Sequence, residues 1–151
     1  VKYISYEEVL SVYAKMIDAS DGGFDGVRDE GGIRAALEFV QNDMYYPNFS
    51  DKLCSLVYKF CSGHYFNDGN KRIALTLGTY FLHKNSYFWQ ATIFMRQMES
   101  IVYHVAASNI DQNLLLRIMT CFMNGEDYDE ELKIDIANAM SKGKLGVRGE
   151  Y

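Results

Sequence analysis

The sequence has little proline, no cysteine pair and no excess of positive charge. One proline in 151 residues leaves few obligatory breaks in helical segments. The three cysteines are odd in number and form no C-x-x-C pair, so we expect buried thiols in a reducing compartment. Fifteen Lys and Arg against twenty Asp and Glu give a net charge of −5, which argues against direct binding of a nucleic-acid backbone.

Long apolar runs are also missing. The longest one, around residues 73–82, is interrupted by Thr76, Gly78 and Thr79, whereas a membrane span needs roughly 20 apolar residues. The first five residues contain no apolar stretch of the signal-peptide type. We therefore expect a cytoplasmic protein that is not anchored in a membrane.

Apolar residues recur mainly at intervals of three and four, the pattern of amphipathic helices. Ser5 and Glu8 form a capping box that begins the first helix, and Ser50 is the expected cap of the third. Further helices are expected over residues 33–41, 51–62, 71–83, 92–107, 111–123 and 129–140. The predicted fold class is all-α, a compact helical bundle, followed from Lys142 by a mobile glycine-containing tail.

Two loops interrupt this pattern. Residues 20–32 hold five of the twelve glycines, which indicates either a flexible connector or a backbone surface that a partner approaches closely. Residues 63–72 bring His, Asp, Asn, Lys and Arg together between two helices. The second loop is therefore the candidate for chemistry.

The start of the helix near Lys71 is a candidate anion site. The first NH groups of a helix have no internal partner, and the helix dipole is positive there. Gly69 lets the backbone curl around a phosphate, and Lys71 and Arg72 add two charges. Phosphate binding is the interpretation that uses all of these features, although the two cations, taken alone, are equally typical of a solvated surface.

Asp68 and His64 would supply the chemistry at such a site. Asp68 can hold the Mg²⁺ that accompanies nucleotide phosphates, and His64 is the loop residue suited to act as a general base. Asn70 can donate and accept hydrogen bonds nearby, and Phe66 is expected to anchor the loop in the core. Taken singly, His64 also fits a helix cap and Asp68 an ordinary turn; a transition-metal site shared by the two lacks a third ligand.

The run His64-Tyr65-Phe66-Asn67-Asp68-Gly69-Asn70-Lys71-Arg72 fills every defined position of the signature H-x-F-x-[DE]-[GA]-N-[GK]-R and so resembles the Fic/Doc family. The segment over residues 26–37 resembles the early segment of Doc-type members. The resemblance covers residues 1–125, a Fic/Doc-like catalytic domain with the catalytic loop between two central helices. Residues 126–151 are then a C-terminal helical extension and tail.

The resemblance implies a transferase that uses ATP and Mg²⁺. His64 would be the general base, Asp68 the Mg²⁺ ligand, and Gly69, Asn70, Lys71 and Arg72 the phosphate-binding residues. Most Fic members carry Gly at the position of Lys71 and transfer AMP. Doc members carry Lys there and transfer the terminal phosphate to a threonine of elongation factor Tu. Doc itself has Ala where this chain has Gly69, which keeps AMP transfer open.

The resemblance also implies two kinds of protein contact. In Fic proteins a flap opposite the motif aligns the backbone of the target, and here the candidate residues are Gly23, Phe24, Asp25, Gly26 and Val27. The self-inhibitory pattern [ST]-x-x-x-E-[GN] of many Fic proteins does not occur in this sequence. Inhibition is therefore expected from a separate antitoxin protein.

The function expected from the sequence is that of a Doc-like toxin in a toxin-antitoxin system, which phosphorylates a hydroxyl group of a translation factor. The first alternative is a Fic-type protein adenylyltransferase. The second is a nucleotide-binding module without turnover.

Overall fold

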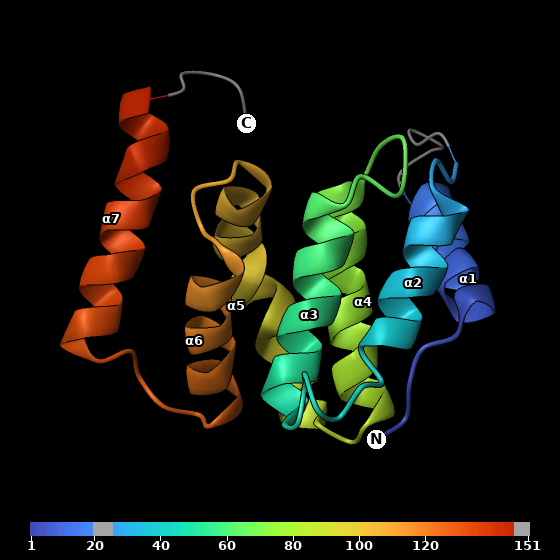
Figure 1. The fold of residues 1–151 in the computed structure, drawn as a ribbon, viewed down its shortest axis with the longest axis horizontal. Helices are drawn as coiled ribbons and strands as arrows, with labels where there is room; N and C mark the ends of the chain where they lie inside the picture. The colour runs from blue at the N-terminus through green and yellow to red at the C-terminus, as the bar shows by residue number, and fades with distance from the viewer. Residues whose placement is uncertain (20–25, 147–151) are drawn as a thin grey trace.

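Seven helices make up the described part of the chain, which confirms the all-α prediction. The structure is a computed structural model that describes residues 1–19 and 26–146, with the side chains of residues 18–19 and 143–146 excepted. Over these residues no strand forms, and one antiparallel bridge joins Val27 to Phe66. The helices are α1 (Tyr6–Ala19), α2 (Glu30–Phe39), α3 (Phe49–Ser62), α4 (Asn70–Lys84), α5 (Phe88–Ala106), α6 (Gln112–Met123) and α7 (Glu130–Gly146) (Figure 1).

The pair α3 and α4 lies at the centre of the molecule (Figure 1). α3 contacts α2, α4, α5 and α6, and α4 packs against α1, α3 and α5. Because neighbours cover several sides of α4, it buries apolar residues around much of its circumference, among them Ile73, Leu75, Leu77 and Phe81. The loop that joins α3 to α4 is thus held between two well-packed helix ends.

A glycine in α4 sets how closely α5 approaches it. A Cβ atom at Gly78 would lie 2.6 Å from Cε2 of Phe94 and 3.1 Å from Cγ2 of Val57. Both distances are shorter than ordinary van der Waals contact, so a larger residue would push the helices apart. The close packing of α4 and α5 fixes two walls of the site described below.

Polar side chains fasten α1 to α4. Ser5 and Glu8 form the predicted capping box: the Ser5 NH donates to Glu8 Oε1 at 3.0 Å, and the Glu8 NH to Ser5 Oγ at 3.1 Å. Glu8 Oε2 accepts hydrogen bonds from the Tyr80 hydroxyl and from Lys84 Nζ, the latter at 2.6 Å. Burial alone would raise the pKa of Glu8, but the hydrogen bonds from Lys84, Tyr80 and Ser5 outweigh it and lower the pKa to about 2.

The start of α3 differs from the prediction that Ser50 caps it. The helix begins at Phe49, behind Asn48, and the carboxylate of Asp51 accepts the Asn48 NH at 2.9 Å. Ser50 therefore lies inside the first turn. Asn and Ser are both favourable N-cap residues, so residue type alone could not show that the cap is Asn48 instead of Ser50.

α5 begins four residues before its predicted start at Thr92. The residues that open it, Phe88 and Trp89, are 56% and 69% exposed, so they do not share the inward periodicity that marks the rest of the helix. Although α5 has 19 residues, none of the described helices is long and apolar enough to cross a lipid bilayer.

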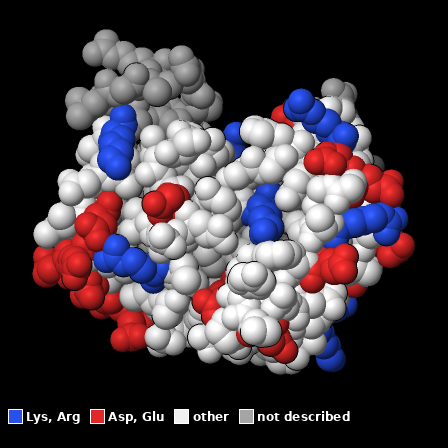
Figure 2. All heavy atoms as spheres, in the orientation of Figure 1, with Lys and Arg blue, Asp and Glu red and all other residues white. Residues whose placement is uncertain are grey.

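α7 packs against α5 and α6 at one edge of the molecule (Figure 1). It buries Leu132, Ile136 and Ala139, and Asp135 pairs with Arg117 of α6 at an Nη1–Oδ2 distance of 2.7 Å. Acidic side chains gather on the surface over this edge (Figure 2). The proposed division of the chain after residue 125 stays a prediction.

The tail prediction needs a correction. α7 continues to Gly146, so residues 142–146 are helical rather than part of a mobile tail. The regular spacing of apolar residues ends at Met140, so the sequence pattern did not predict the last turns of α7. Residues 147–151 lie outside the described part of the chain.

Two of the three cysteines are buried thiols, as predicted. Cys54 and Cys61 are each 2% exposed, and burial raises their pKa values to about 12 and about 11. Cys121 is half-buried instead, with its Sγ 3.2 Å from the carbonyl oxygen of Glu126. Cys121 lies in the last turn of α6, and its Sγ is also 3.4 Å from the carbonyl oxygen of Asp127.

Candidate active site

The loop between α3 and α4 begins in a strained backbone conformation. His64 has a φ of 53°, in the left-handed region that costs about 1 kcal/mol or more for a residue with a side chain. The preceding Gly63 leaves room for the next ring, because a Cβ there would lie 2.4 Å from Cε1 of Tyr65. Tyr65 in turn packs edge-on against Phe60 of α3. The turn leaves the imidazole of His64 exposed, and strain of this kind is concentrated at functional sites.

Phe66 attaches the middle of the loop to the core. Its side chain is fully buried and stacks on Tyr13 of α1, with ring centroids 4.2 Å apart. The side chain of Asn70 closes the loop around this anchor: its Nδ2 donates to the Phe66 carbonyl at 2.9 Å, and its Oδ1 accepts the Phe66 NH at 3.2 Å. Both polar atoms of the Asn70 side chain are thus bonded to the loop backbone. The phosphate contact predicted for Asn70 would therefore come from its backbone NH.

A second stretch of backbone runs beside the motif loop. Val27 and Phe66 form the antiparallel bridge, and the Asn67 NH donates to the Gly26 carbonyl at 3.2 Å. The carbonyl oxygen of Tyr65 accepts the NH groups of residues 28 and 29 at 2.8 and 3.0 Å. Gly26 and Val27 of the predicted flap therefore lie against the motif.

The other residues of the predicted flap, Gly23, Phe24 and Asp25, lie outside the described residues.

The start of α4 has the geometry of an anion site. Gly69, its N-cap, adopts a φ of 80°. The NH groups of Asn70, Lys71 and Arg72 follow it, and Ile73 is the residue whose NH bonds back to the Gly69 carbonyl, at 2.9 Å. The first NH groups of a helix point along its axis at the positive end of the dipole. They can therefore receive a phosphate.

A cavity of about 240 Å³ brings five of the predicted residues to one space: His64, Asp68, Gly69, Asn70 and Lys71. The other residues that line it are Cys61, Asn67, Tyr103, Ala106 and Ala107. An imidazole, a carboxylate and a helix N-terminus with a lysine thus face one another. Transfer of a phosphoryl or nucleotidyl group to a hydroxyl requires a base and an anion cradle in this relation.

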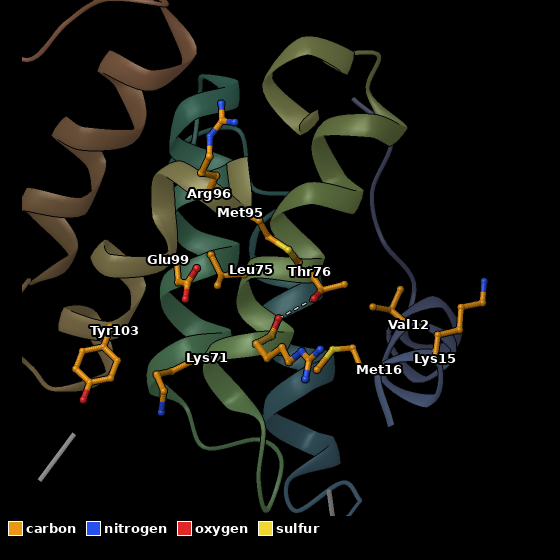
Figure 3. Close-up of a pocket in the computed structure, with 11 residues that line it drawn as sticks. Val12, Lys15, Met16, Lys71, Leu75, Thr76, Met95, Arg96, Glu99 and Tyr103 are labelled. Carbon is orange, nitrogen blue, oxygen red and sulfur yellow. Dashed lines mark hydrogen bonds between the residues drawn. The ribbon is translucent and has the colours of Figure 1, made fainter. Parts of the chain in front are cut away.

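Arg72 lies in a neighbouring cavity instead. This space of about 610 Å³ is bounded by α1, α4 and α5 (Figure 3). Apolar side chains line it, together with Glu99 and four cations: Lys15, Lys71, Arg72 and Arg96. Successive residues of a helix differ by about 100° in direction, so Lys71 and Arg72 leave α4 on different sides. Lys71 lines both cavities.

Asp68 is the acidic residue that lines the smaller cavity. Its Oδ1 accepts the Gly69 NH at 2.8 Å, which holds the carboxylate beside the start of α4. Among the residues that the structure describes, no group of three or more His, Cys, Asp and Glu is placed to hold a metal ion. One carboxylate next to an anion site fits Mg²⁺, which takes its remaining ligands from phosphate oxygens and water.

The walls that α3 and α5 contribute to the smaller cavity were not predicted from the sequence. Tyr103, Ala106 and Ala107 come from the end of α5, and Cys61 from the last turn of α3. Cys61 was predicted to be a buried thiol packed in the core. Two small side chains at a helix end, Ala106 and Ala107, leave space and so weakly indicate a cavity. Nothing in the neighbouring sequence connects this pair with the motif.

Comparisons with known proteins agree with the motif. The model of the Fic/DOC family matches residues 3–82. The chain is 31% identical over 114 residues to Toxin Doc of Mycolicibacterium smegmatis, an alignment that covers 73% of this chain and 85% of that protein. It is 34% identical over 88 residues to Protein kinase doc of Escherichia phage P1, covering 56% of this chain and 69% of that protein.

Proposed function

Because the chain belongs to the Fic/Doc family, we propose that it acts as a Doc-like toxin that transfers the terminal phosphate of ATP to a hydroxyl group of a protein. One observation carries this proposal: His64, Asp68 and the start of α4 with Lys71 line the same cavity. The names of the two relatives, one a toxin and one a protein kinase, support it.

The start of α4 binds the phosphates. The NH groups of Asn70 and Lys71 donate to phosphate oxygens, and the ammonium of Lys71 neutralises part of their charge. Arg72, on the adjacent side of α4, extends the positive region toward the larger cavity. A cavity of about 240 Å³ suits phosphate groups better than a whole nucleotide, because sites for ligands of that size usually measure ~300–1,000 Å³.

His64 prepares the nucleophile. Its imidazole accepts the proton of the target hydroxyl while the hydroxyl oxygen bonds to the terminal phosphorus. The bond from that phosphorus to the bridging oxygen breaks, and ADP leaves with the electron pair. The strained turn at His64 serves this step by holding the ring at the mouth of the cavity instead of in the core.

Asp68 would hold Mg²⁺ carried by the nucleotide. An ion held by Asp68 would neutralise part of the negative charge on the phosphates during transfer. The exposed carboxylate of Asp68 is kept beside the helix start by its hydrogen bond with the Gly69 NH. The residues present therefore fit one Mg²⁺ that is shared with substrate.

Lys71 favours phosphate transfer over AMP transfer. A lysine at this position adds volume and charge where a glycine would leave room for another phosphate. Gly69 is the feature that favours the alternative, a protein adenylyltransferase, because Doc itself carries Ala there. The test below separates the two reactions.

Two protein partners belong to the proposal. The target is a translation elongation factor, and its backbone pairs with a flap that includes Gly26 and Val27, next to the motif loop. A separate antitoxin protein inhibits the enzyme, and the similarity to a protein named as a toxin supports this part of the proposal.

The test is labelling of a bacterial lysate with ATP that carries its label in either the terminal or the innermost phosphate. We expect label from the terminal phosphate in one protein. His64→Asn should abolish labelling without loss of folding, because Asn tolerates a positive φ but cannot act as the base. His83→Asn, which changes an exposed histidine near the end of α4, is the matched control. Full labelling by His64→Asn would show that the base assignment is wrong.

A further inference from the structure

Lys71 and Tyr103 stand at the boundary between the two cavities. Of the described residues, these two alone line both the cavity that contains His64 and the larger one beside α1. Lys71 lies in the first turn of α4, and Tyr103 in the last turn of α5. Figure 3 shows their side chains next to each other on neighbouring helices. The position of the Lys71 ammonium therefore decides which cavity receives its charge.

The ring of Tyr103 provides a contact that can hold this ammonium. Nζ of Lys71 lies 5.9 Å from the ring centroid, within the range of a cation–π interaction. Lys71 is exposed and forms no ion pair with any described carboxylate, including Glu99, which lines the larger cavity one turn earlier on α5. Without the ring, the flexible four-carbon stem of Lys71 would let the charge move between the cavities.

We propose that Tyr103 is a positioning residue that holds Lys71 toward the phosphate end of bound ATP. The inference rests on the proposed function and adds to it a residue outside the motif. The ring attracts the ammonium while it lies at the boundary, so the phosphates meet a cation that is already in place. An aliphatic residue at position 103 would occupy similar space without this attraction.

The experiment measures binding of ATP and of adenosine by calorimetry. Tyr103→Leu should raise the Kd for ATP about two- to fivefold, the range of an exposed cation–π contact, and leave the Kd for adenosine unchanged. Tyr103→Phe keeps the ring and should stay close to wild type. Trp89→Leu removes an exposed aromatic residue of the same helix that lines neither cavity, so it controls for loss of a ring from α5.

A second background isolates the pair. In a Lys71→Met protein, Tyr103→Leu should cause no further loss of ATP affinity, because no ammonium is left to hold. Equal losses in both backgrounds would overturn the inference, and so would a loss in Tyr103→Phe as large as in Tyr103→Leu. If Tyr103→Leu folds poorly, Tyr103→Gln takes its place, since the residue is 38% exposed and tolerates a polar side chain.

The outcome separates this inference from the proposed function. If the wild-type protein binds no ATP, the proposed function fails and the inference falls with it. If the wild-type protein binds ATP and labels its target while Tyr103→Leu binds ATP equally well, the proposed function stands and the role of Tyr103 is wrong.

Discussion

Replacing Asn70 by Ala tests whether this side chain closes the motif loop or contacts the nucleotide. The amide makes two hydrogen bonds to Phe66, at 2.9 and 3.2 Å, and Phe66 is fully buried. Removing the amide leaves a buried carbonyl and a buried NH without their partner. A buried group left unsatisfied costs about 1–3 kcal/mol, so the loss of partners for two groups in Asn70→Ala should lower the free energy of unfolding by about 2–6 kcal/mol.

Urea unfolding and thermal unfolding measure this loss. For a chain of this size, at about 2–4 °C per kcal/mol, such a loss lowers Tm by roughly 4–24 °C. Transfer to the target should fall about tenfold or more, because the loop that carries His64 and Asp68 loses its closure and each 1.4 kcal/mol is a factor of ten. Asn113→Ala, which removes the same amide from an exposed position of α6, should change neither.

Unchanged stability together with lost transfer would contradict a loop-closing role for the Asn70 side chain. Asn70 would then act on the nucleotide through its side chain, as the family resemblance implies, and the loop would hold its shape without it.

Two further predictions concern other parts of the fold. Glu8→Gln should lower the free energy of unfolding by about 1 kcal/mol at pH 7. The folded pKa of Glu8, about 2, lies below the ordinary value of 4.5, so the extra stability of the wild type in urea unfolding should shrink as pH falls from 4.5 to 2. A difference in stability that stays constant over this pH range would contradict a stabilising contact of the Glu8 carboxylate with Lys84 and Tyr80. In the native protein, a thiol reagent should modify Cys121 before Cys54 and Cys61, since burial raises the pKa values of the latter two to about 12 and 11. Peptide mass spectrometry gives the order in which the three thiols are modified. Modification of Cys61 before Cys121 would show that reagent reaches Cys61 through the smaller cavity.

Much of the fold was predictable because most helices bury one face. Periodicity of three and four located the helices, and the Ser5–Glu8 pair correctly marked the start of α1. The exceptions have physical causes. Phe88 and Trp89 open α5 without facing the core. In α7 the regular spacing of apolar residues ends at Met140, before the helix ends, so neither helix end carries a periodic signal.

The site was predictable only where it is contiguous in the chain. Five predicted residues between His64 and Lys71 line the smaller cavity. Because they lie close together in the sequence, a local motif was enough to identify them. Asn70 was predicted to bind phosphate, whereas its side-chain amide is bonded to the backbone of Phe66. Residue type alone could not reveal this, because an amide serves equally to close a loop or to bind an anion. Tyr103, Ala106 and Ala107 join the site through the packing of α5 on α4, which depends on contacts such as Gly78 with Phe94 and leaves no local pattern.

Mass spectrometry of the modified target shows directly whether the enzyme transfers phosphate to a protein hydroxyl. After incubation of the purified protein with Mg²⁺, ATP and a bacterial lysate, we expect one phosphate on a hydroxyl side chain of an elongation factor, and we expect it to be absent with His64→Asn. An AMP adduct at that position would contradict phosphate transfer and assign the chain to the adenylyltransferases. If the protein binds ATP but modifies no protein of the lysate, the site is a nucleotide-binding module without turnover.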